Sequence, residues 1–228
     1  GPGAMGCLFG GFLSKSGQDV IFLDHNKERA KNISGHGLKI EGISGEHTIP
    51  IKAACEPSKL GLPDLVIICV KAYDTEKAVK VLSGLAKKGT LFLTLQNGIG
   101  NLEIIAGEVG TNQALGGITS HGATLLGEGH IRHAGKGPTA VGFNKGIKLS
   151  VTTEKKLNEI VKAFNSAGFE TKVSDDVEGL LWTKLIINVG INALTGLTRL
   201  NNGRLIEYTG THEVLRRAVE EAVRVAQA

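Results

Sequence analysis

The chain has 228 residues, 41% of them apolar, which is enough for one large or two small domains with a substantial core. Its net charge of +4 comes from both signs spread along the sequence, which gives no reason to expect nucleic-acid binding and suits an anionic small ligand. The three cysteines form no C-x-x-C pair, and neither a signal peptide nor an uninterrupted apolar run of membrane-spanning length is seen. We therefore expect a cytoplasmic protein with no disulfide framework, no zinc cluster and no membrane partner.

The chain begins with the pattern G-x-G-x-x-G, formed by Gly1-Pro2-Gly3-Ala4-Met5-Gly6. Glycines at this spacing allow a tight strand-to-helix turn and let the backbone approach a pyrophosphate at a helix N-terminus. A helical pattern follows, and then a strand at 20–23 that ends at Asp24, an acidic residue placed to bind a ribose hydroxyl. The sequence therefore predicts a dinucleotide site whose first strand is missing; the alternative is that Gly1-Pro2 are a remnant of cloning.

Up to about residue 174, short apolar runs alternate with amphipathic stretches, as is typical of βαβ units. The continuous apolar run 65–70 predicts a strand that is buried on both faces. We further expect a small hairpin within 38–51, helices over 75–85 and 154–167, an edge strand at 170–173, and strands at 91–95, 114–119, 130–133 and 139–143. These elements predict an α/β, Rossmann-type dinucleotide-binding domain with a mainly parallel sheet over residues 1–174.

From residue 175 the strand signals nearly vanish and two long helical patterns appear, at about 178–197 and 211–228. The turn Asn201-Asn202-Gly203 separates them, and the last helix meets no stop signal. We predict an all-α second domain over 175–228 that is truncated at its C-terminal end. Its apolar face is compatible with a homodimer but does not require one.

Three polar residues interrupt the first of these apolar helices: Lys184, Asn188 and Asn192. At i, i+4 and i+8 they lie on one stripe of a helix, within roughly 80° of arc. Polar groups inside an apolar helix are costly unless a partner satisfies them. We interpret this stripe as facing a substrate; the alternative is that the three side chains bond to one another or to nearby backbone.

Two more polar residues follow predicted strands, Lys71 after 65–70 and Asn97 after 91–95. Ligands bind at the carboxyl ends of strands in open α/β sheets, so we expect both residues to line the same crevice as the glycine turn. The alternatives are a solvated lysine at a strand end and, for Asn97-Gly98, an ordinary turn.

The histidines show no spacing typical of metal ligands, so no metal is expected. His130 and His133 are three positions apart in a predicted strand, which would point them to opposite faces. For His121, after the strand 114–119, we expect a structural role.

Several segments of the chain, in this order, resemble the 2-dehydropantoate 2-reductase (ketopantoate reductase) family: G-P-G-A-M-G, V-K-A-Y, Q-N-G-I-G, S-H-G-A, L-W-T-K-L-I-I-N-V-G-I-N-A-L-T and N-N-G-R-L. The resemblance implies NADPH-dependent reduction of a small keto acid, 2-dehydropantoate, to (R)-pantoate, a step toward pantothenate and coenzyme A. It places the family's general acid on Lys184. It places the substrate-binding residues on Asn97, Asn188, Asn192 and Asn202, and the cofactor contacts on Gly1, Pro2, Gly3, Ala4, Met5, Gly6, Lys71, Asn97 and the backbone near Ala123.

The choice between NADP and NAD depends on the residues after the second strand. The basic residue that favours NADP in the family aligns with His25, next to Asp24, whose charge would repel a 2′-phosphate and favour NAD. His25, Asn26, Lys27 or Arg29 can still bind that phosphate, so we expect NADP, with NAD as the alternative. Family members also have a strand before the glycines and a further C-terminal helical stretch with a serine and a glutamate that bind substrate, so we expect this chain to be a fragment.

Two other functions fit the same features. One is another two-domain NAD(P)-dependent dehydrogenase that acts on a different 2-keto or hydroxy acid. The other is a module that binds NAD(P) without turnover.

Overall fold

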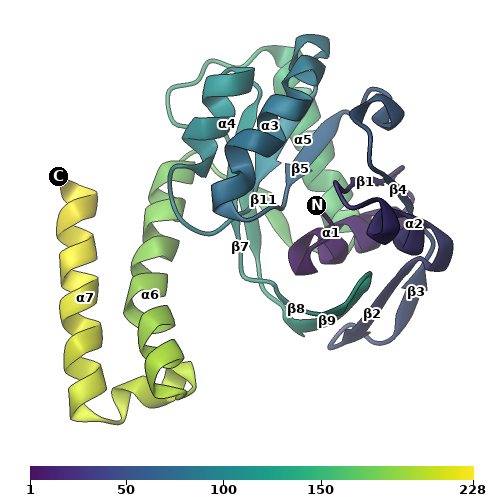
Figure 1. Cartoon of the computed structure of the whole chain (residues 1–228). Helices are drawn as coiled ribbons and strands as arrows, with labels where there is room; N and C mark the ends of the chain where they lie inside the picture. The colour runs from purple at the N-terminus through teal and green to yellow at the C-terminus, as the bar shows by residue number, and fades with distance from the viewer. The chain divides into compact units, whose positions relative to one another are not determined.

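In the computed structural model the chain forms two compact units, one of residues 1–96 and 100–177 and the other of residues 97–99 and 178–228 (Figure 1). The structure describes the backbone of residues 1–228 and the side chains of residues 1–86 and 89–228. The short segment 97–99 therefore groups with the helices of the second unit, although both of its chain neighbours belong to the first.

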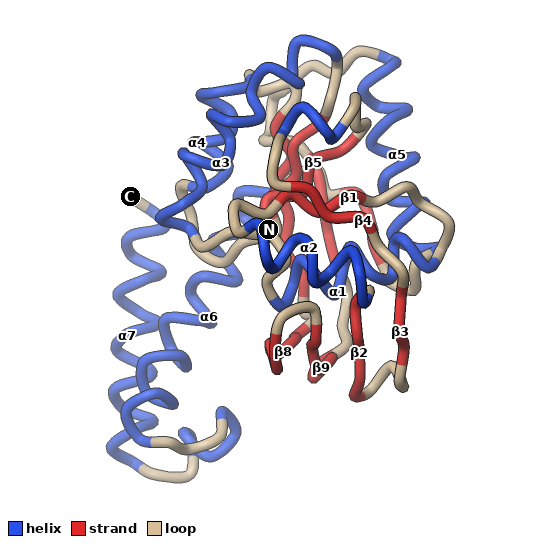
Figure 2. The backbone as a smooth tube through the Cα atoms, turned by 45° about the vertical axis from the view of Figure 1, so that its right-hand side comes forward, coloured by secondary structure: helices blue, strands red, loops and turns tan.

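The largest sheet of the first unit has the strand order β11-β10-β7-β6-β5, with the bounds Thr171–Val173, Thr139–Gly142, Ala114–Thr119, Leu91–Thr94 and Leu65–Ile68. Its strands pair in parallel except for β10 and β7. Figure 2 shows α3 (Thr75–Leu82) and α4 (Asn101–Val109) on one side of this sheet and α5 (Val151–Ser166) on the other. Every residue of β6 is buried, because strands flank it and helices cover both faces.

Two smaller sheets complete the first unit. β1 (Ile21–Leu23) and β4 (Lys52–Ala54) pair in parallel. A four-stranded sheet has the order β3-β2-β9-β8, with the bounds His47–Ile49, Leu38–Gly42, His130–Gly135 and Gly122–Gly127. Helix α1 (Ala4–Lys15) packs on this sheet, and α2 (Lys27–His36) packs on β4. The remaining short 3-10 helices are η1 (Pro57–Leu60), η2 (Ala72–Asp74) and η3 (Ser83–Lys88).

The predicted α/β class with a mainly parallel sheet is confirmed, and so are the hairpin, now β2 and β3, and the edge strand β11. The prediction for the run 65–70 was wrong in one respect. β5 pairs only with β6 and ends the order of its sheet, so three of its four residues are half-buried instead of buried on both faces. The sequence patterns also missed α2, β4, α4 and β8.

Helix α5 begins three residues earlier than the sequence predicted. The hydroxyl of Ser150 accepts a hydrogen bond of 3.1 Å from the backbone N–H of Thr153, which satisfies one of the free amides at the helix start. The apolar periodicity on which the prediction rested contains no information about this cap, so the boundary was placed too late.

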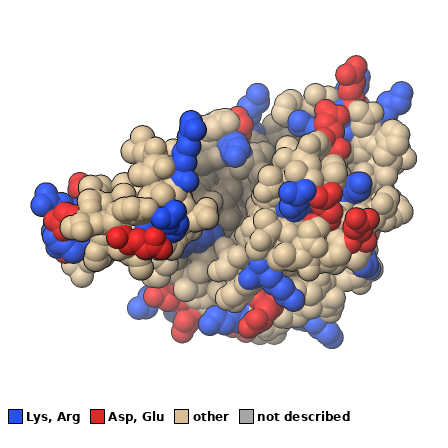
Figure 3. Space-filling model, turned by 90° about the horizontal axis from the view of Figure 1, so that it is seen from below, with Lys and Arg blue, Asp and Glu red and all other residues tan. Residues whose placement is uncertain are grey.

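The second unit contains α6 (Val177–Thr198, whose first residue belongs to the first unit), η4 (Asn202–Ile206) and α7 (Thr209–Gln227). A Cβ atom on Gly190 would lie only 2.9 Å from Cγ2 of Val219, so the glycine lets α6 and α7 approach closely. On α7 Glu213 binds Arg217 at 2.7 Å, and Glu220 binds Arg216 at 2.6 Å. In the face shown in Figure 3, basic and acidic side chains lie near one another.

Helix α6 meets the length and composition of a membrane span, with 22 residues and a mean hydropathy of 1.4 over its most apolar stretch, 11% of which is buried. The sequence contains no uninterrupted apolar run of this length, because Lys184 and Asn188 interrupt the helix. These two residues lower its mean hydropathy only slightly. A helix in the core of a soluble protein meets the same condition. The exclusion of a membrane therefore stays a prediction.

Candidate functional site

The glycine turn is built for close approach of the backbone to a ligand. A Cβ atom on Gly6 would lie 2.2 Å from the carbonyl oxygen of Gly1, so only glycine allows α1 to start this close to the preceding turn. At Gly3, by contrast, the nearest atom to such a Cβ is the carbonyl oxygen of Cys69 at 3.9 Å. The first turn of α1 contains no acidic residue and has no side-chain cap, so its amides are available to an anion. These features fit the pyrophosphate of a dinucleotide.

Asp24 follows β1, and its carboxylate is almost completely buried. Arg29 binds it through Nε and through Nη2, the latter at 2.6 Å, and the N–H of Asn26 donates a bond of 3.0 Å. Burial by itself raises the pKa of Asp24, but these donors outweigh that effect and the pKa is lowered. The carboxylate is therefore ionised and already paired within the protein.

The pairing of Asp24 changes the electrostatics expected from the sequence alone. A free aspartate would repel a 2′-phosphate, but here the guanidinium of Arg29 balances its charge. Exposed basic groups stand beside the pair, since the side chain of His25 is 94% exposed and Lys27 is exposed as well. This end of β1 therefore presents a neutral pair beside two basic side chains, His25 and Lys27, and one acidic side chain, Glu28.

Lys71 and Asn97 lie after β5 and β6, two neighbouring parallel strands, and both are exposed. The loop that carries Asn97 turns through Gly98 and Gly100, whose φ angles of +89° and +90° favour glycine. The side-chain amide of Gln96 donates a bond of 2.7 Å to the carbonyl oxygen of Val70 and so connects the two strand ends.

Lys184, Asn188 and Asn192 all lie on α6, which runs unbroken through the three positions. Lys184 and Asn188 are half-buried, and Asn192 is exposed. Only part of α6 is covered by other residues of the described chain, which leaves one end of the row accessible. Burial lowers the pKa of the Lys184 ammonium below its ordinary value.

The two remaining predicted residues lie in different units. Asn202 is the exposed first residue of η4, in the second unit. Ala123 is half-buried in β8, in the first unit. The structure thus places Asn97, Lys184, Asn188, Asn192 and Asn202 in the second unit, and the glycine turn, Asp24, His25, Lys71 and Ala123 in the first.

A buried pair of histidines lies in the first unit and was not predicted as a pair. Nδ1 of His121 is 3.1 Å from Nε2 of His133, and His133 also binds the hydroxyl of Ser44. His121 is 7% exposed and His133 is 3% exposed, with the ring of Phe169 perpendicular to that of His121. Burial is the main cause that lowers the pKa of both rings. His130, on the other face of β9, instead binds Glu41 at 2.9 Å.

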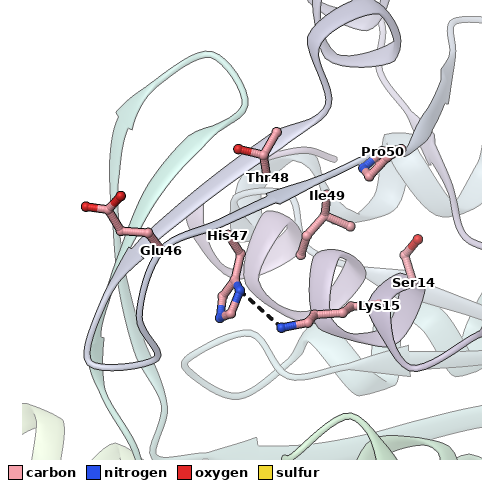
Figure 4. Close-up of a pocket in the computed structure, with 7 residues that line it drawn as sticks. All are labelled: Ser14, Lys15, Glu46, His47, Thr48, Ile49 and Pro50. Atoms are coloured by element: carbon pink, nitrogen blue, oxygen red, sulfur yellow. Dashed lines mark hydrogen bonds between the residues drawn. The ribbon is translucent and has the colours of Figure 1, made fainter.

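A surface hollow of about 420 Å³ lies at the C-terminal end of α1, beside β3 (Figure 4). Nζ of Lys15 lies 3.0 Å from Nδ1 of His47 at its edge, and no predicted site residue lines it. A helix of 12 residues is about 18 Å long, so this hollow is at the far end of α1 from the glycine turn. Among the described residues, no three His, Cys, Asp or Glu side chains gather to hold a metal ion.

Comparison with known proteins identifies two matching family models. The model described as "Ketopantoate reductase PanE/ApbA" matches residues 1–146, and the model described as "Ketopantoate reductase PanE/ApbA C terminal" matches residues 176–228. The chain is 38% identical to the 2-dehydropantoate 2-reductase of Halobacterium salinarum over 229 residues, covering 100% of this chain and 74% of that protein.

Solved structures agree with these matches. The crystal structure of 2-dehydropantoate 2-reductase from Geobacter metallireducens is similar with a TM-score of 0.88 and 29% identity, covering 100% of this chain and 74% of that one. The ternary structure of D-mandelate dehydrogenase with NADH and anilino(oxo)acetate is similar with a TM-score of 0.86 and 27% identity, covering 100% and 72%.

Proposed function

We propose, from the premise that the chain belongs to the ketopantoate reductase PanE/ApbA family, that it is a cytosolic NADPH-dependent reductase of 2-dehydropantoate in pantothenate biosynthesis. The observation that carries this proposal is the grouping of the predicted reacting residues. Asn97 belongs to the same compact unit as Lys184, Asn188, Asn192 and Asn202, although it is far from them in the sequence.

The two parts of the chain have separate tasks in this proposal. Residues 1–174 bind the dinucleotide, with the pyrophosphate at the glycine turn and the start of α1, where the exposed amides and the helix dipole favour negative charge. Residues 175–228 bind the keto acid and offer an apolar helical face for a homodimer.

A bound NADPH would supply the hydride that reduces the C2 ketone. Lys184 donates a proton to the carbonyl oxygen as negative charge develops there. Its lowered pKa suits this task, because an ammonium with a lower pKa is a stronger acid and gives up its proton more readily. The amides of Asn188 and Asn192 orient the carboxylate and hydroxyl groups of the substrate, since each amide offers both donors and acceptors.

The preference for NADPH over NADH rests on the surroundings of Asp24. Because Arg29 already balances the carboxylate, the adjacent basic groups of His25 and Lys27 determine the local charge. Next to the exposed Glu28, His25 and Lys27 are the side chains at this position that offer a 2′-phosphate hydrogen-bond donors.

A second candidate function is reduction of a different 2-keto acid with NADH. The similarity to the D-mandelate dehydrogenase structure, whose title names NADH and anilino(oxo)acetate, favours this alternative. A third is cofactor binding without turnover.

A steady-state assay of the complete gene product separates these functions. We expect 2-dehydropantoate to be reduced with NADPH at a higher kcat/KM than with NADH. Faster reduction of an aryl or branched 2-keto acid would favour the second function. Binding of NADPH with no oxidation in the presence of any keto acid would favour the third.

A further inference from the structure

Hydrogen-bonded polar side chains, two of them buried, lie at the two ends of the loop that carries Asn97. Thr75 is the first residue of α3 and is 0% exposed, and Asn101 is the first residue of α4 and is 4% exposed. The hydroxyl of Thr75 accepts a bond of 2.9 Å from the side-chain amide of Gln96 and donates one of 3.0 Å to Oδ1 of Asn101. We call Gln96, Thr75 and Asn101 the Thr75 bridge.

The Thr75 bridge joins the two ends of one loop. Gln96 immediately precedes Asn97, and Asn101 immediately follows Gly100, so a single hydroxyl connects the residues on both sides of segment 97–100. Within this segment Gly98 and Gly100 have left-handed φ angles and therefore give it little stiffness of their own. The hydrogen bonds at its two ends therefore restrict how far it can move.

The same bridge reaches the loop of Lys71. The amide of Gln96 also donates to the carbonyl oxygen of Val70, at 2.7 Å, and Thr94 donates to Oε1 of Gln96 at 2.8 Å. All of these polar atoms belong to the first unit, and none of them is among the buried side-chain atoms of the described residues that lack a hydrogen-bond partner. A buried polar network is low in free-energy cost only when each of its groups has a hydrogen-bond partner. The network then holds its side chains in one geometry.

We propose that Thr75 is a positioning residue: through its hydroxyl it holds the Asn97 loop and the end of β5 in the arrangement that binds the dinucleotide and its substrate. This inference rests on the proposed function for the roles of Asn97 and Lys71. Thr75 itself touches neither ligand and acts through Gln96 and Asn101. Small displacements of positioned groups cost much of the rate in enzymes, so the loss of one hydroxyl should be measurable.

The experiment compares Thr75→Val, which removes the hydroxyl and keeps the shape, with Thr75→Ser, which keeps the hydroxyl. The matched control is Thr90→Val, because Thr90 is equally buried, at 1% exposed, and donates its hydroxyl to Pro63 at the opposite end of β6. The full-length variants are compared by NADPH titration, followed by nicotinamide fluorescence, and by steady-state kinetics, well below their melting temperatures.

We expect Thr75→Val to weaken NADPH binding and to lower kcat/KM by about tenfold or more, while Thr75→Ser and Thr90→Val stay within about twofold of wild type. Wild-type binding and kinetics in Thr75→Val, an equal loss in Thr90→Val, or no rescue by serine would each overturn the proposal. If the wild-type protein binds NADPH but does not reduce 2-dehydropantoate, the proposed function fails, and the titrations still decide the role of Thr75.

Discussion

The guanidinium of Arg29 binds the carboxylate of Asp24 through two of its nitrogens, and the bond from Nη2 to Oδ1 is 2.6 Å long. The pair stands where dinucleotide-binding folds recognise the ribose, so it bears directly on the choice of cofactor. An aspartate in this position would ordinarily indicate NAD. In this structure Asp24 is instead the buried partner of Arg29.

Replacement of Arg29 by glutamine should raise the KM for NADPH about tenfold, equivalent to about 1.4 kcal/mol, and leave the KM for NADH nearly unchanged. The reason is that the substitution leaves the charge of Asp24 unbalanced, and this charge then repels the 2′-phosphate. It should also lower the free energy of unfolding by about 2 kcal/mol, because a buried carboxylate loses its partner. In the double variant Asp24→Asn with Arg29→Gln, stability and the preference for NADPH should both return in part, because the unbalanced carboxylate charge is gone while His25 and Lys27 remain. Equal changes in both KM values would contradict this account.

Alanine at Gly3 and at Gly6 should have different effects. At Gly3 the protein leaves room for a Cβ atom, so Gly3→Ala should fold and should bind NADPH at least about tenfold more weakly, because the methyl group occupies the approach of the pyrophosphate. At Gly6 the Cβ atom would collide with the carbonyl oxygen of Gly1, so this variant should lose both thermal stability and binding. Thermal unfolding and fluorescence titration check both results. Wild-type affinity in Gly3→Ala would place the pyrophosphate elsewhere.

Lys184→Ala should lower kcat by about 10²–10⁴-fold, the range for removal of a general acid, whereas Asn192→Ala should mainly raise KM. The lysine acts on charge that develops in the transition state, and the asparagine holds the substrate throughout. Because burial lowers the pKa of Lys184, the wild-type kcat should decline as pH rises through that pKa, at a lower pH than an exposed lysine would give. Initial rates from pH 6 to 10 measure this limb. Full turnover by Lys184→Ala would exclude the assignment.

The histidine pair predicts how stability depends on pH. Burial lowers the pKa of His121 and His133 below the usual 6.5. At a pH between the lowered values and 6.5, the unfolded chain therefore binds more protons than the folded one. The positive charge of Lys136 acts in the same direction on both rings. The free energy of unfolding should therefore fall as pH drops through and below 6.5, as measured by urea denaturation. His121→Asn should reduce this fall, and the exposed control His212→Asn should leave it unchanged. The same pH dependence in His121→Asn would show that other groups cause it.

Much of the fold was predictable because its signals are local. The glycine spacing, the alternation of strands and helices, and the polar stripe on an apolar helix are all contained in short windows of sequence. The residues of the α6 row share a helix for this reason, and the helix is present as predicted.

The parts that the sequence did not reveal depend on contacts between distant segments. Three cases are the pairing of His121 with His133, the edge position of β5 and the bridge from Thr75 to both ends of the Asn97 loop. The burial of Asp24 by Arg29 joins residues only five positions apart, yet a charged pair in sequence does not indicate whether the pair is exposed. Hydrogen-bond partners of this kind are set by three-dimensional packing and not by periodicity.

The discontinuity of the second unit limits how the chain can be divided or recombined. A fragment that begins at residue 178 would leave Asn97–Ile99 behind in the other piece. Chimeras made with relatives should therefore exchange segment 96–101 together with the helices after 177, so that both parts of the unit come from one parent. A single crossover at the apparent boundary would combine a loop from one ancestor with helices adapted to another.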